Sequence, residues 1–485
     1  MTITPGAAPW GLIVGGGGAA GMAAAIFAAE RTSRVLLIEH ADVLGGTLWV
    51  ANGQLSAAGT RLQRDKGIED DAQAHFDDIM RLSRGTVNEA LVRLAVWNAA
   101  ETFDWLMDQG FDIDPACPVD GVGHEPYSRA RYYWGRNGGA SLRDVLIPRV
   151  EQAVADGRIT LRLGHEALSL TTNPGGAVTG VTTRDAHGAE HRFEAAQTVL
   201  ATGGCSASPD VYQAMNGVPL YTNLPYAYSQ GVGHRLGCSV GGWLRGRENF
   251  FVNFGFLLDG EGPRPGMVGR LNTYPQRRPP WEIYVNARGD RFVREDMESV
   301  DARENALLEQ PDQRYWVVFD ERILSEAPPF IAGFDANEIR ALFEEGRPFF
   351  YKADDLTNLA QKAGVEAHGL MRAVRGYNYG VHSGNDFLGR RHLPLPIAQG
   401  PFYAIRVQGA AVSSAVGLAV NDQLQVIRPD GSAIPGLWAA GELLGASQTM
   451  GRAVCGGMMA TPALTFGRLL GQKLIPLTSK SGSTA

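Results

Sequence analysis

The chain has 485 residues, of which 44% are hydrophobic, and this length suits two or three domains with buried cores. Its net charge of -7 argues against a nucleic acid or an anionic membrane surface as a partner. The four cysteines are scattered, which argues against a disulfide framework and a zinc site, and we expect no metal ion.

Neither an export signal nor a membrane segment is predicted. The first ten residues lack a charged stretch followed by an apolar one, and no apolar run reaches the roughly 20 residues that cross a bilayer. We therefore expect a cytoplasmic protein without membrane insertion. The small polar residues at 478–485 predict a flexible tail.

A strand, a turn, a helix and a second strand are predicted close to the N-terminus. The apolar run at residues 12–14 is typical of a buried parallel strand, an Ala-rich helix follows at 22–30, and a second apolar run lies at 35–38. This order is typical of the first half of a nucleotide-binding α/β domain.

Gly16, Gly18 and Gly21 stand between that strand and helix in G-x-G-x-x-G spacing. The first glycine makes the tight turn, the second lets a pyrophosphate approach the backbone, and the third lets the helix pack closely on the strand. Glu39, at the end of the second strand, suits the hydroxyl pair of a ribose. The glycines alone would be weak support, but the complete order predicts a dinucleotide site.

Three segments follow with distinct patterns. Residues 41–60 hold too many Gly and Ala residues for an ordinary helix, and they form either backbone against a flat ligand or an irregular loop. Residues 69–110 have apolar side chains at helical spacing, which predicts core-facing helices. Residues 123–139 crowd tyrosines and arginines between glycines, so this loop either lines a ligand site or packs on its own aromatic rings.

Helix and strand patterns then alternate to about residue 204. The expected elements are a helix at 141–155, a strand at 160–163, an antiparallel meander at 167–171, 178–183 and 191–193, and a strand at 198–201. Thr202 and Gly203 begin a second glycine turn at a strand end. Two such turns fit a sheet whose strands all lead to one crevice.

The pattern changes after about residue 221, where proline, arginine and aromatic residues become frequent. Here we expect a hairpin at 283–293 turning at 288–290, a strand at 317–320, and helices at 356–363 and 365–376. Beyond residue 394, strands at 402–407, 417–420 and 436–440 and a helix at 457–475 indicate a return to the first pattern. The sequence thus predicts an inserted domain at 223–392 within a discontinuous domain formed by 1–222 and 393–485.

Seven motifs carry a resemblance over nearly the whole chain. They are GGGGAAG at 15–21, GGT at 45–47, ATGG at 201–204, NARGDRFVRE at 286–295, GPFYA at 400–404, IPGLWAAGE at 434–442 and GGMMATPALTFGRLLG at 456–471. In this order they resemble the flavoprotein family of soluble fumarate reductases, urocanate reductases and 3-ketosteroid dehydrogenases.

The resemblance implies an α/β fold: a discontinuous Rossmann-like FAD-binding domain with an inserted α+β capping domain and the active site between them. It implies hydride exchange between flavin N5 and a carbon β to an activating carbonyl. It also places Glu442 on the ribityl chain and the start of the last helix at the pyrimidine edge of the flavin. No histidine stands where relatives attach FAD covalently, so we expect non-covalent FAD.

The expected FAD-binding residues come from the glycine turns, the strand ends and the start of the last helix. They are Gly16, Gly18, Ala19, Ala20, Gly21, Glu39, His40, Gly45, Gly46, Thr47, Ala51, Asn52, Gly53, Ala167, Ala201, Thr202, Gly203, Gly441, Glu442, Gly457, Met458 and Met459. Free N–H groups at the last three would stabilise the negative charge of a reduced flavin.

The chain departs from its relatives at the positions of the acid and base groups. Fumarate reductases resemble one another in cationic or imidazole groups that here align with Ser299, Val454 and the segment containing Ser413. The tyrosines of ketosteroid dehydrogenases would fall on Ser299 and Ala453, whereas their glycine N–H matches Gly457. The resemblance therefore implies carbonyl-adjacent chemistry with acid and base groups recruited from elsewhere.

The candidate catalytic residues are consequently Tyr127, Tyr132, Tyr133, Arg452 and Gly457. A tyrosine near cations can serve as a base, although a tyrosine in a loop is more often a packing residue. Arg452 would clamp a carboxylate, polarise a carbonyl, or form an ion pair within its loop.

Other polar residues are expected to be structural. His124, His234 and His382 are expected to be loop residues, Cys455 a small buried residue, and Tyr377, Asn378, Asp386 and Arg390 domain-junction structure.

We therefore expect an FAD-dependent oxidoreductase that desaturates a cyclic ketone, a small-molecule carbonyl substrate. With no built-in haem or iron–sulfur relay expected, reoxidation would use dioxygen or an external electron acceptor. The first alternative is reduction of an α,β-unsaturated acid or enone. The second is a flavin-binding protein without catalysis that acts as a redox-responsive partner.

Overall fold

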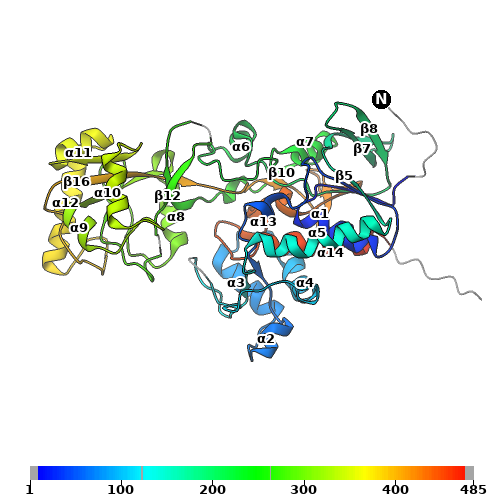
Figure 1. Cartoon of the computed structure of the whole chain (residues 1–485), viewed down its shortest axis with the longest axis horizontal. Helices are drawn as coiled ribbons and strands as arrows, with labels where there is room; N and C mark the ends of the chain where they lie inside the picture. The colour runs from blue at the N-terminus through cyan, green and yellow to red at the C-terminus, as the bar shows by residue number, and fades with distance from the viewer. Residues whose placement is uncertain (1–8, 122–123, 263, 273, 476–485) are drawn as a thin grey trace, which may run out of the picture.

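The computed structural model describes residues 9–121, 124–262, 264–272 and 274–475. The tail expected at 478–485 therefore lies outside the described residues. Figure 1 shows two lobes side by side: one around a parallel sheet, here called the first unit, and one around an antiparallel sheet, the second unit. Each unit has its own hydrophobic core. Among the described residues, no helix combines the length and the apolar character that crossing a bilayer requires.

The first unit is built on a sheet in the order β18-β19-β9-β1-β2-β5, in which only β18 runs antiparallel to its neighbour. Its strands are β1 Leu12–Gly15, β2 Val35–Ile38, β5 Ile159–Arg162, β9 Thr198–Leu200, β18 Gln425–Ile427 and β19 Ala433–Ala439. The central strands are wholly buried, as their continuous apolar sequences predict. Strands from both ends of the chain thus lie in one sheet, and the α/β fold predicted from the sequence is confirmed.

Helices cover this sheet and extend below it in Figure 1. They are α1 Ala19–Ala29, α2 Arg61–Asp65, α3 Ala72–Ser83, α4 Glu89–Asp108, α5 Gly139–Ala155, α6 Pro209–Asn216, α7 Val232–Ser239, α13 Ser447–Met450 and α14 Ala460–Leu474, with 3-10 turns η1 Gly46–Trp49, η2 Arg247–Asn249 and η4 Gly441–Leu444. The last helix, expected from residue 457, begins at Ala460, because Gly457 has a φ of 81° that a right-handed helix excludes.

Smaller sheets complete the first unit. The predicted meander is confirmed as β6 Glu166–Thr172, β7 Val178–Arg184 and β8 Glu190–Glu194, and two-stranded sheets pair β3 Leu55–Ser56 with β4 Tyr132–Tyr133 and β10 Leu244–Arg245 with β17 Gly417–Leu418. The loop expected at 123–139 therefore contains a short strand. This strand, β4, pairs with β3 and so fixes the Gly- and Ala-rich segment at 41–60 to the loop.

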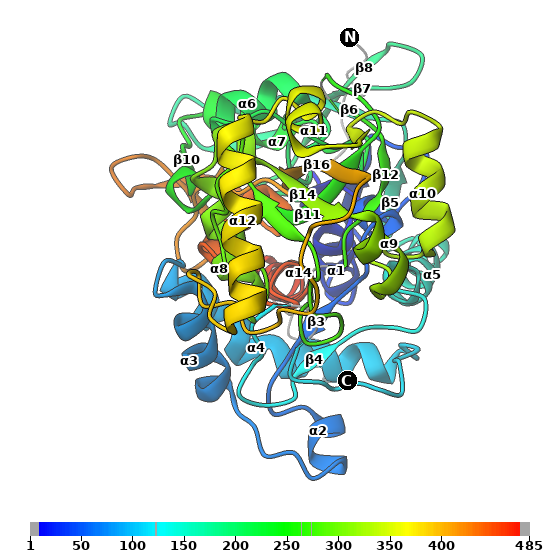
Figure 2. The ribbon, with the colours of Figure 1, turned by 90° about the vertical axis from the view of Figure 1, so that its left-hand side faces the viewer.

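The second unit is viewed directly in Figure 2, where α12 crosses in front of the strands β11, β14 and β16. Its elements are β11 Asn253–Leu258, β12 Met267–Arg270, β13 Ile283–Val285, α8 Val300–Leu308, η3 Pro311–Gln313, β14 Arg314–Asp320, α9 Glu321–Glu326, α10 Ala336–Glu344, β15 Phe350–Ala353, α11 Leu356–Ala363, α12 Ala367–Ser383 and β16 Phe402–Ala410. The helix predicted at 356–363 is confirmed, and α12 extends further than predicted.

Two expectations for this part of the chain are corrected. The strand expected at 402–407 in the returning first unit is instead β16, which pairs antiparallel with β14, β15 and β11 at the centre of the second sheet. Its apolar sequence suits a buried strand in either sheet, so only the pairing distinguishes them. The hairpin expected at 283–293 is reduced to one bridge, Val285 with Arg291, because β13 pairs with β14. Since the second core runs from Val252 to Val407, we propose that the inserted domain extends past residue 392.

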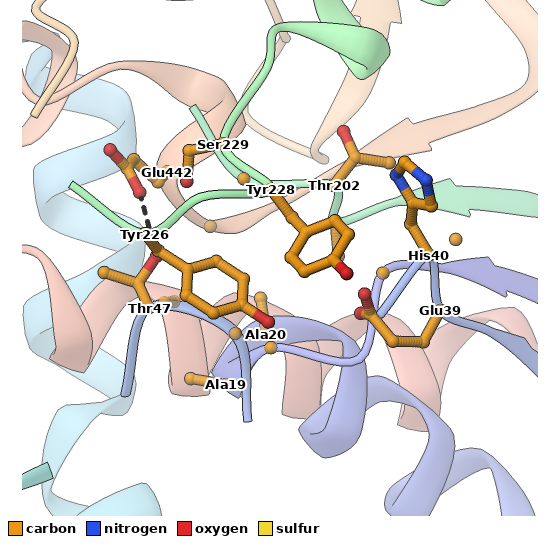
Figure 3. Close-up of a pocket in the computed structure, with 18 of the residues that line it drawn as sticks. Ala19, Ala20, Glu39, His40, Thr47, Thr202, Tyr226, Tyr228, Ser229 and Glu442 are labelled. Carbon is orange, nitrogen blue, oxygen red and sulfur yellow. Dashed lines mark hydrogen bonds between the residues drawn. The ribbon is translucent and has the colours of Figure 1, made fainter. Parts of the chain in front are cut away.

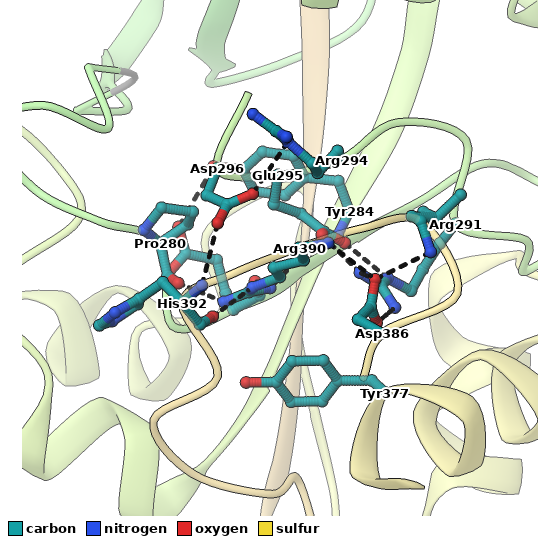
Figure 4. Close-up of polar contacts among 12 residues, drawn as sticks. Pro280, Tyr284, Arg291, Arg294, Glu295, Asp296, Tyr377, Asp386, Arg390 and His392 are labelled. Carbon is teal, nitrogen blue, oxygen red and sulfur yellow. Dashed lines mark hydrogen bonds and ion pairs between the residues drawn. The ribbon is translucent and has the colours of Figure 1, made fainter. Parts of the chain in front are cut away.

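A buried ionic network supports the centre of the second unit (Figure 4). The Arg291 guanidinium pairs with Asp386 at 2.5 Å and with Glu295 at 2.7 Å, and all three side chains are fully buried. Arg390 also lies 3.5 Å from Glu295, and its guanidinium covers the ring of buried Tyr377. The network connects the NARGDRFVRE segment to the segment after α12. Each buried charge in it has a partner, which is the condition for tolerating such groups in a core.

Removing one member should therefore destabilise the second unit. We expect Asp386→Asn to lower the free energy of unfolding by about 3 kcal/mol, because it removes one carboxylate from a buried guanidinium. Chemical denaturation followed by circular dichroism measures this change. Arg372→Ala, which breaks the exposed pair of Arg372 with Asp290 at 2.6 Å, is the matched control and should leave the midpoint unchanged. Equal effects of both variants would contradict a stabilising role for the network.

Candidate functional site

A deep pocket lies at the carboxyl ends of the first unit's parallel strands, between the N-terminus of α1 and the start of α14 (Figure 3). Its lining comes from segments distant in the sequence: Gly15, Gly16, Gly18, Ala19, Ala20, Ile38, Glu39, His40, Gly46, Thr47, Leu48, Ala51, His165, Glu166, Ala167, Ala201, Thr202, Gly203, Tyr226, Tyr228, Ser229, Val232, Gly441, Glu442, Met459, Ala460 and Ala463. A crevice at this edge of a parallel sheet is the usual ligand position in α/β folds.

The N-terminus of α1 forms one wall of the pocket. Gly18 is the N-cap residue of α1. A Cβ on Gly18 would have only the Gly46 Cα nearby, at 4.0 Å, so a ligand can approach the Gly18 backbone. Gly21 does not line the pocket. A Cβ there would lie 1.8 Å from the Gly16 carbonyl oxygen, so this glycine allows the helix to pack on the turn. Bare backbone and an N-terminal helix end together suit a pyrophosphate.

A carboxylate stands at each end of the pocket in Figure 3. Glu39 is buried and accepts the backbone N–H groups of Gly17 at 2.6 Å and Ala41 at 2.7 Å, which orients the acid at the end of β2. Glu442 accepts the Thr47 hydroxyl at 3.3 Å, and burial raises the pKa of its carboxyl although the Thr47 bond opposes this rise. Acids at both ends of the pocket, with a helix N-terminus between them, suit an extended dinucleotide.

The pocket gathers most, but not all, of the residues predicted to bind the cofactor. Those outside its lining are Gly21, Gly45, Asn52, Gly53, Gly457 and Met458. Gly45 donates its N–H to the Gly17 carbonyl at 2.9 Å and so supports the glycine turn from behind. The expectation of a free N–H at Met458 is wrong, because this group donates to the Cys455 carbonyl at 3.0 Å.

Several lining residues were missed by the sequence analysis. The rings of Tyr226 and Tyr228 lie over the pocket in Figure 3, and the Tyr228 ring is 4.9 Å from that of His40. Ser229, Val232, His165 and Glu166 complete this group. Residues 226–232 were assigned to the inserted domain from their composition. Tyr226 and Tyr228, followed by Gly231, form an aromatic pair near a glycine, and this pattern could have indicated a ligand-binding segment.

Tyr133 and Tyr127 lie inside the first unit rather than at the pocket. Tyr133 is 0% exposed, its hydroxyl is 3.0 Å from the Thr60 hydroxyl and donates to the Ala57 carbonyl at 3.2 Å, and its ring packs on Phe103. The Tyr127 hydroxyl donates to the Gly456 carbonyl at 2.5 Å. Burial raises the pKa of both phenols. These contacts give both tyrosines a structural role, and the packing alternative for this loop fits them.

Tyr132 differs from its two neighbours. Its ring lies against Gly456, where a Cβ would come within 2.8 Å of the ring carbons, and no hydrogen-bond partner of its hydroxyl is found in the described chain. Burial raises the pKa of the Tyr132 phenol, and nearby Tyr274 of the second unit raises it further. This phenol therefore stays protonated at neutral pH and remains available as a donor.

Arg452 lies at the surface, away from the pocket. Its side chain is exposed, its Nε donates to the Glu248 carbonyl at 3.0 Å, and its backbone N–H donates to the Thr86 hydroxyl at 3.0 Å. These bonds connect the loop before α14 to its neighbours. Neither bond joins Arg452 to the three candidate tyrosines. The bonds fit a structural role for Arg452 in its loop.

His124 has a different environment from the one expected. It lies with two buried acids of α8, Asp301 and Glu304, and one side-chain atom of each lies within 4.8 Å of the others. No local pattern indicates this cluster, because His124 lies far in the sequence from the two acids and only folding of the two units against each other brings it to them.

Comparisons with known proteins agree with this geometry. The profile of a family described as FAD binding domain matches residues 11–458. A fumarate reductase (cytochrome) of Shewanella frigidimarina is 27% identical over 97% of this chain and 78% of its own length. A urocanate reductase of Eggerthella lenta is 28% identical over 95% and 73%. A 4-oxocyclohexanecarboxylate 2-dehydrogenase of Sinomonas cyclohexanicum is 26% identical over 96% and 92%.

Solved structures share the fold. The open conformation of a flavocytochrome c3 fumarate reductase is 25% identical, covers 95% of this chain and 77% of its own, and superposes with a TM-score of 0.68. A 3-ketosteroid delta1-dehydrogenase from Sterolibacterium denitrificans, at 19% identity, covers 96% and 99% with a TM-score of 0.74.

The pocket makes a direct prediction about FAD. Gly18→Ala should weaken FAD binding about tenfold or more, because its methyl group would occupy the space that a pyrophosphate needs beside the backbone. The unliganded protein should unfold at an unchanged temperature, since the added methyl meets nothing closer than 4.0 Å and the φ of Gly18 is −79°.

Quenching of flavin fluorescence during titration of the apoprotein measures this affinity. Gly260→Ala is the matched control, because a Cβ there has nothing within 4 Å and the site lies in the second unit. Unchanged affinity in Gly18→Ala would show that the pyrophosphate does not lie at the α1 turn.

Proposed function

The chain belongs to the FAD-binding domain family, and from this premise we propose that it is an FAD-dependent oxidoreductase that desaturates a cyclic ketone at the carbons α and β to the carbonyl. Bound FAD supplies a hydride acceptor for this chemistry. The protein must provide a donor for the carbonyl oxygen, a base for the α-proton, and a position for the β-hydrogen near the flavin.

The observation that carries the proposal is the position of Tyr132. Its phenol lies against Gly456, in the short segment before α14 whose end, Met459, lines the pocket. It is available for a new hydrogen bond, and the neighbouring Tyr274 belongs to the second unit. A neutral phenol at the junction of the two units suits donation to a ketone oxygen, which becomes more negative as the α-proton leaves.

The positions occupied by cations in fumarate reductases support a ketone over a dicarboxylate. Ser299 caps α8 by accepting the Ala302 N–H, and Val454 donates its N–H to Asp301 at 3.2 Å. Arg452 is exposed and bonded to the Glu248 carbonyl. A dianionic substrate would need fixed cationic partners to compensate for its lost hydration.

The second candidate is reduction of an α,β-unsaturated acid or enone. The names of the fumarate and urocanate reductases among its relatives favour it. Both candidates act on a CH–CH bond beside a carbonyl and differ in direction. In either case we propose non-covalent FAD, an external electron acceptor or dioxygen, and a cytoplasmic location.

Anaerobic mixing separates the candidates. We expect 4-oxocyclohexanecarboxylate or 4-androstene-3,17-dione to bleach the oxidised flavin, followed by absorbance at about 450 nm, because the flavin takes up the hydride. Rapid reoxidation of the photoreduced protein by fumarate, urocanate or 2-cyclohexenone would instead establish the reductase. A protein that does neither would be a flavin-binding protein without this catalysis.

Tyr132→Phe tests the donor. It should slow bleaching by about a hundredfold while FAD stays bound, since it removes one hydrogen bond to the developing negative oxygen. Tyr133→Phe is the matched neighbour: it removes a buried hydroxyl bonded to Thr60 and Ala57 and should leave the bleaching rate close to that of the wild type. Normal bleaching in Tyr132→Phe would remove this phenol from the reaction.

A further inference from the structure

The cluster of His124, Asp301 and Glu304 lies where the two units meet. His124 Nδ1 is 3.4 Å from Asp301 Oδ1, and Asp301 and Glu304 stand three residues apart on α8. The two acids are 6% and 3% exposed, whereas the His124 side chain is 19% exposed. Of the three side chains, the imidazole is therefore the most exposed.

Asp301 lies beside the imidazole, with its Oδ1 3.4 Å from His124 Nδ1. Asp301 also accepts the backbone N–H of Val454 at 3.2 Å, so its carboxylate is fixed between the two units. A carboxylate beside Nδ1 favours the tautomer in which Nδ1 carries the proton. Nε2 is then the basic nitrogen. Behind this pair, the Glu304 carboxylate accepts the Phe254 N–H at 3.1 Å.

The surroundings set the proton affinity of the cluster. Burial opposes a charged imidazole, but the bond with Asp301 and the charge of Glu304 together raise the pKa of His124. Burial raises the pKa of Glu304 to about 7; nearby His124 opposes this rise, and nearby Asp301 adds to it. Arg270 of β12 lowers the pKa of both groups. Glu304 therefore titrates near neutral pH beside an imidazole whose pKa is raised, and neutral pH is the range in which a general base is most effective.

The cluster is also connected to the pocket. Asp301 binds the backbone of Val454, and the segment from Val454 passes Gly456, which lies against Tyr132, to Met459 in the pocket lining. Tyr132 and Asp301, the acid beside the imidazole, therefore contact the same short segment. A second bond between the units, from the Ser299 hydroxyl to the Glu125 carboxylate, lies beside the cluster.

On the basis of the proposed function, we propose that His124 exchanges the substrate's α-proton through Nε2, with Asp301 and Glu304 as its positioning residues. In desaturation the α C–H bond breaks and its proton passes to Nε2. The electron pair of that bond forms the new C=C bond, and the β-hydrogen leaves with its own electron pair towards FAD. In the reverse direction the imidazolium returns the proton to the α-carbon.

The first test measures the imidazole itself, without turnover. In protein labelled with ¹³C at the histidine ring, the resonance lost in His124→Gln identifies His124, and its shift against pH gives its pKa. We expect Glu304→Gln to lower this pKa by about half a unit or more, because a nearby negative charge is removed. His382→Gln, at an exposed site on α12, should lose a different resonance and leave the pKa of His124 unchanged. An unchanged pKa in Glu304→Gln would overturn the coupling and with it the inference.

The second test measures ketone-dependent bleaching of the flavin against pH. In the wild type the rate should rise as His124 loses its proton, and in Glu304→Gln the midpoint of this rise should move down by the amount measured by resonance. His124→Gln should slow bleaching about a hundredfold with FAD still bound. If His124→Gln does not retain FAD, the midpoint of Glu304→Gln decides the question.

The outcomes distinguish the two proposals. If ketone bleaches the flavin of the wild type and of His124→Gln equally fast, the inference is overturned and the proposed function stays intact. An unshifted midpoint in Glu304→Gln has the same meaning. If none of the ketones bleaches the wild-type flavin and none of the enones reoxidises it, the proposed function is overturned. The role of His124 as its base is then overturned with it.

Discussion

The close packing of α1 on α14 is the constraint on which the site depends. A Cβ on Gly467 would lie 2.2 Å from the Ala20 carbonyl oxygen, and one on Gly471 would lie 2.4 Å from that of Ala24. Only glycines on one helix and small residues on the other allow this distance between backbones. The contact joins the two ends of the chain, so the glycine turn before α1 and the segment before α14 border the same pocket. A larger side chain at either glycine would separate the two walls.

How far the sequence predicts this structure depends on how local each signal is. β2 lies where it was predicted and the glycine turn is followed by a helix, because apolar runs, turn glycines and a strand-end acid act over a few residues. β16 was placed in the wrong sheet because its side chains are suited to burial in either one, and its partners β14 and β11 lie far away in sequence. Composition likewise misassigned Tyr226 and Tyr228, which belong to the pocket although the chain around them resembles the insertion.

The same distinction applies to the candidate catalytic groups. Tyr127, Tyr132 and Tyr133 are nearly adjacent in sequence, yet a strand of two residues directs Tyr133 into the core and Tyr132 towards Gly456. Alternation along a strand is a local rule, but it applies only where a strand exists. That strand depends on pairing with Leu55–Ser56, which no local pattern indicated. The tyrosine favoured by the sequence was therefore one residue away from the phenol that remains available.

The contrast between two sets of charges indicates where the molecule can respond to protons. In the core of the second unit, Arg291 is bonded to two carboxylates, and this attraction lowers the pKa of Asp386 although burial opposes the shift. At the seam between the units, two acids share one imidazole, and no guanidinium among the described residues pairs with either acid within the distance of an ion pair. Burial there raises the pKa of the Glu304 carboxyl to about 7. Ser299 and Val454 contribute to this seam, because Ser299 binds Glu125 and the Val454 backbone binds Asp301. An uncharged serine and a backbone amide thus tie the two units together beside a titratable cluster, whereas the core of the second unit is held by fixed charges.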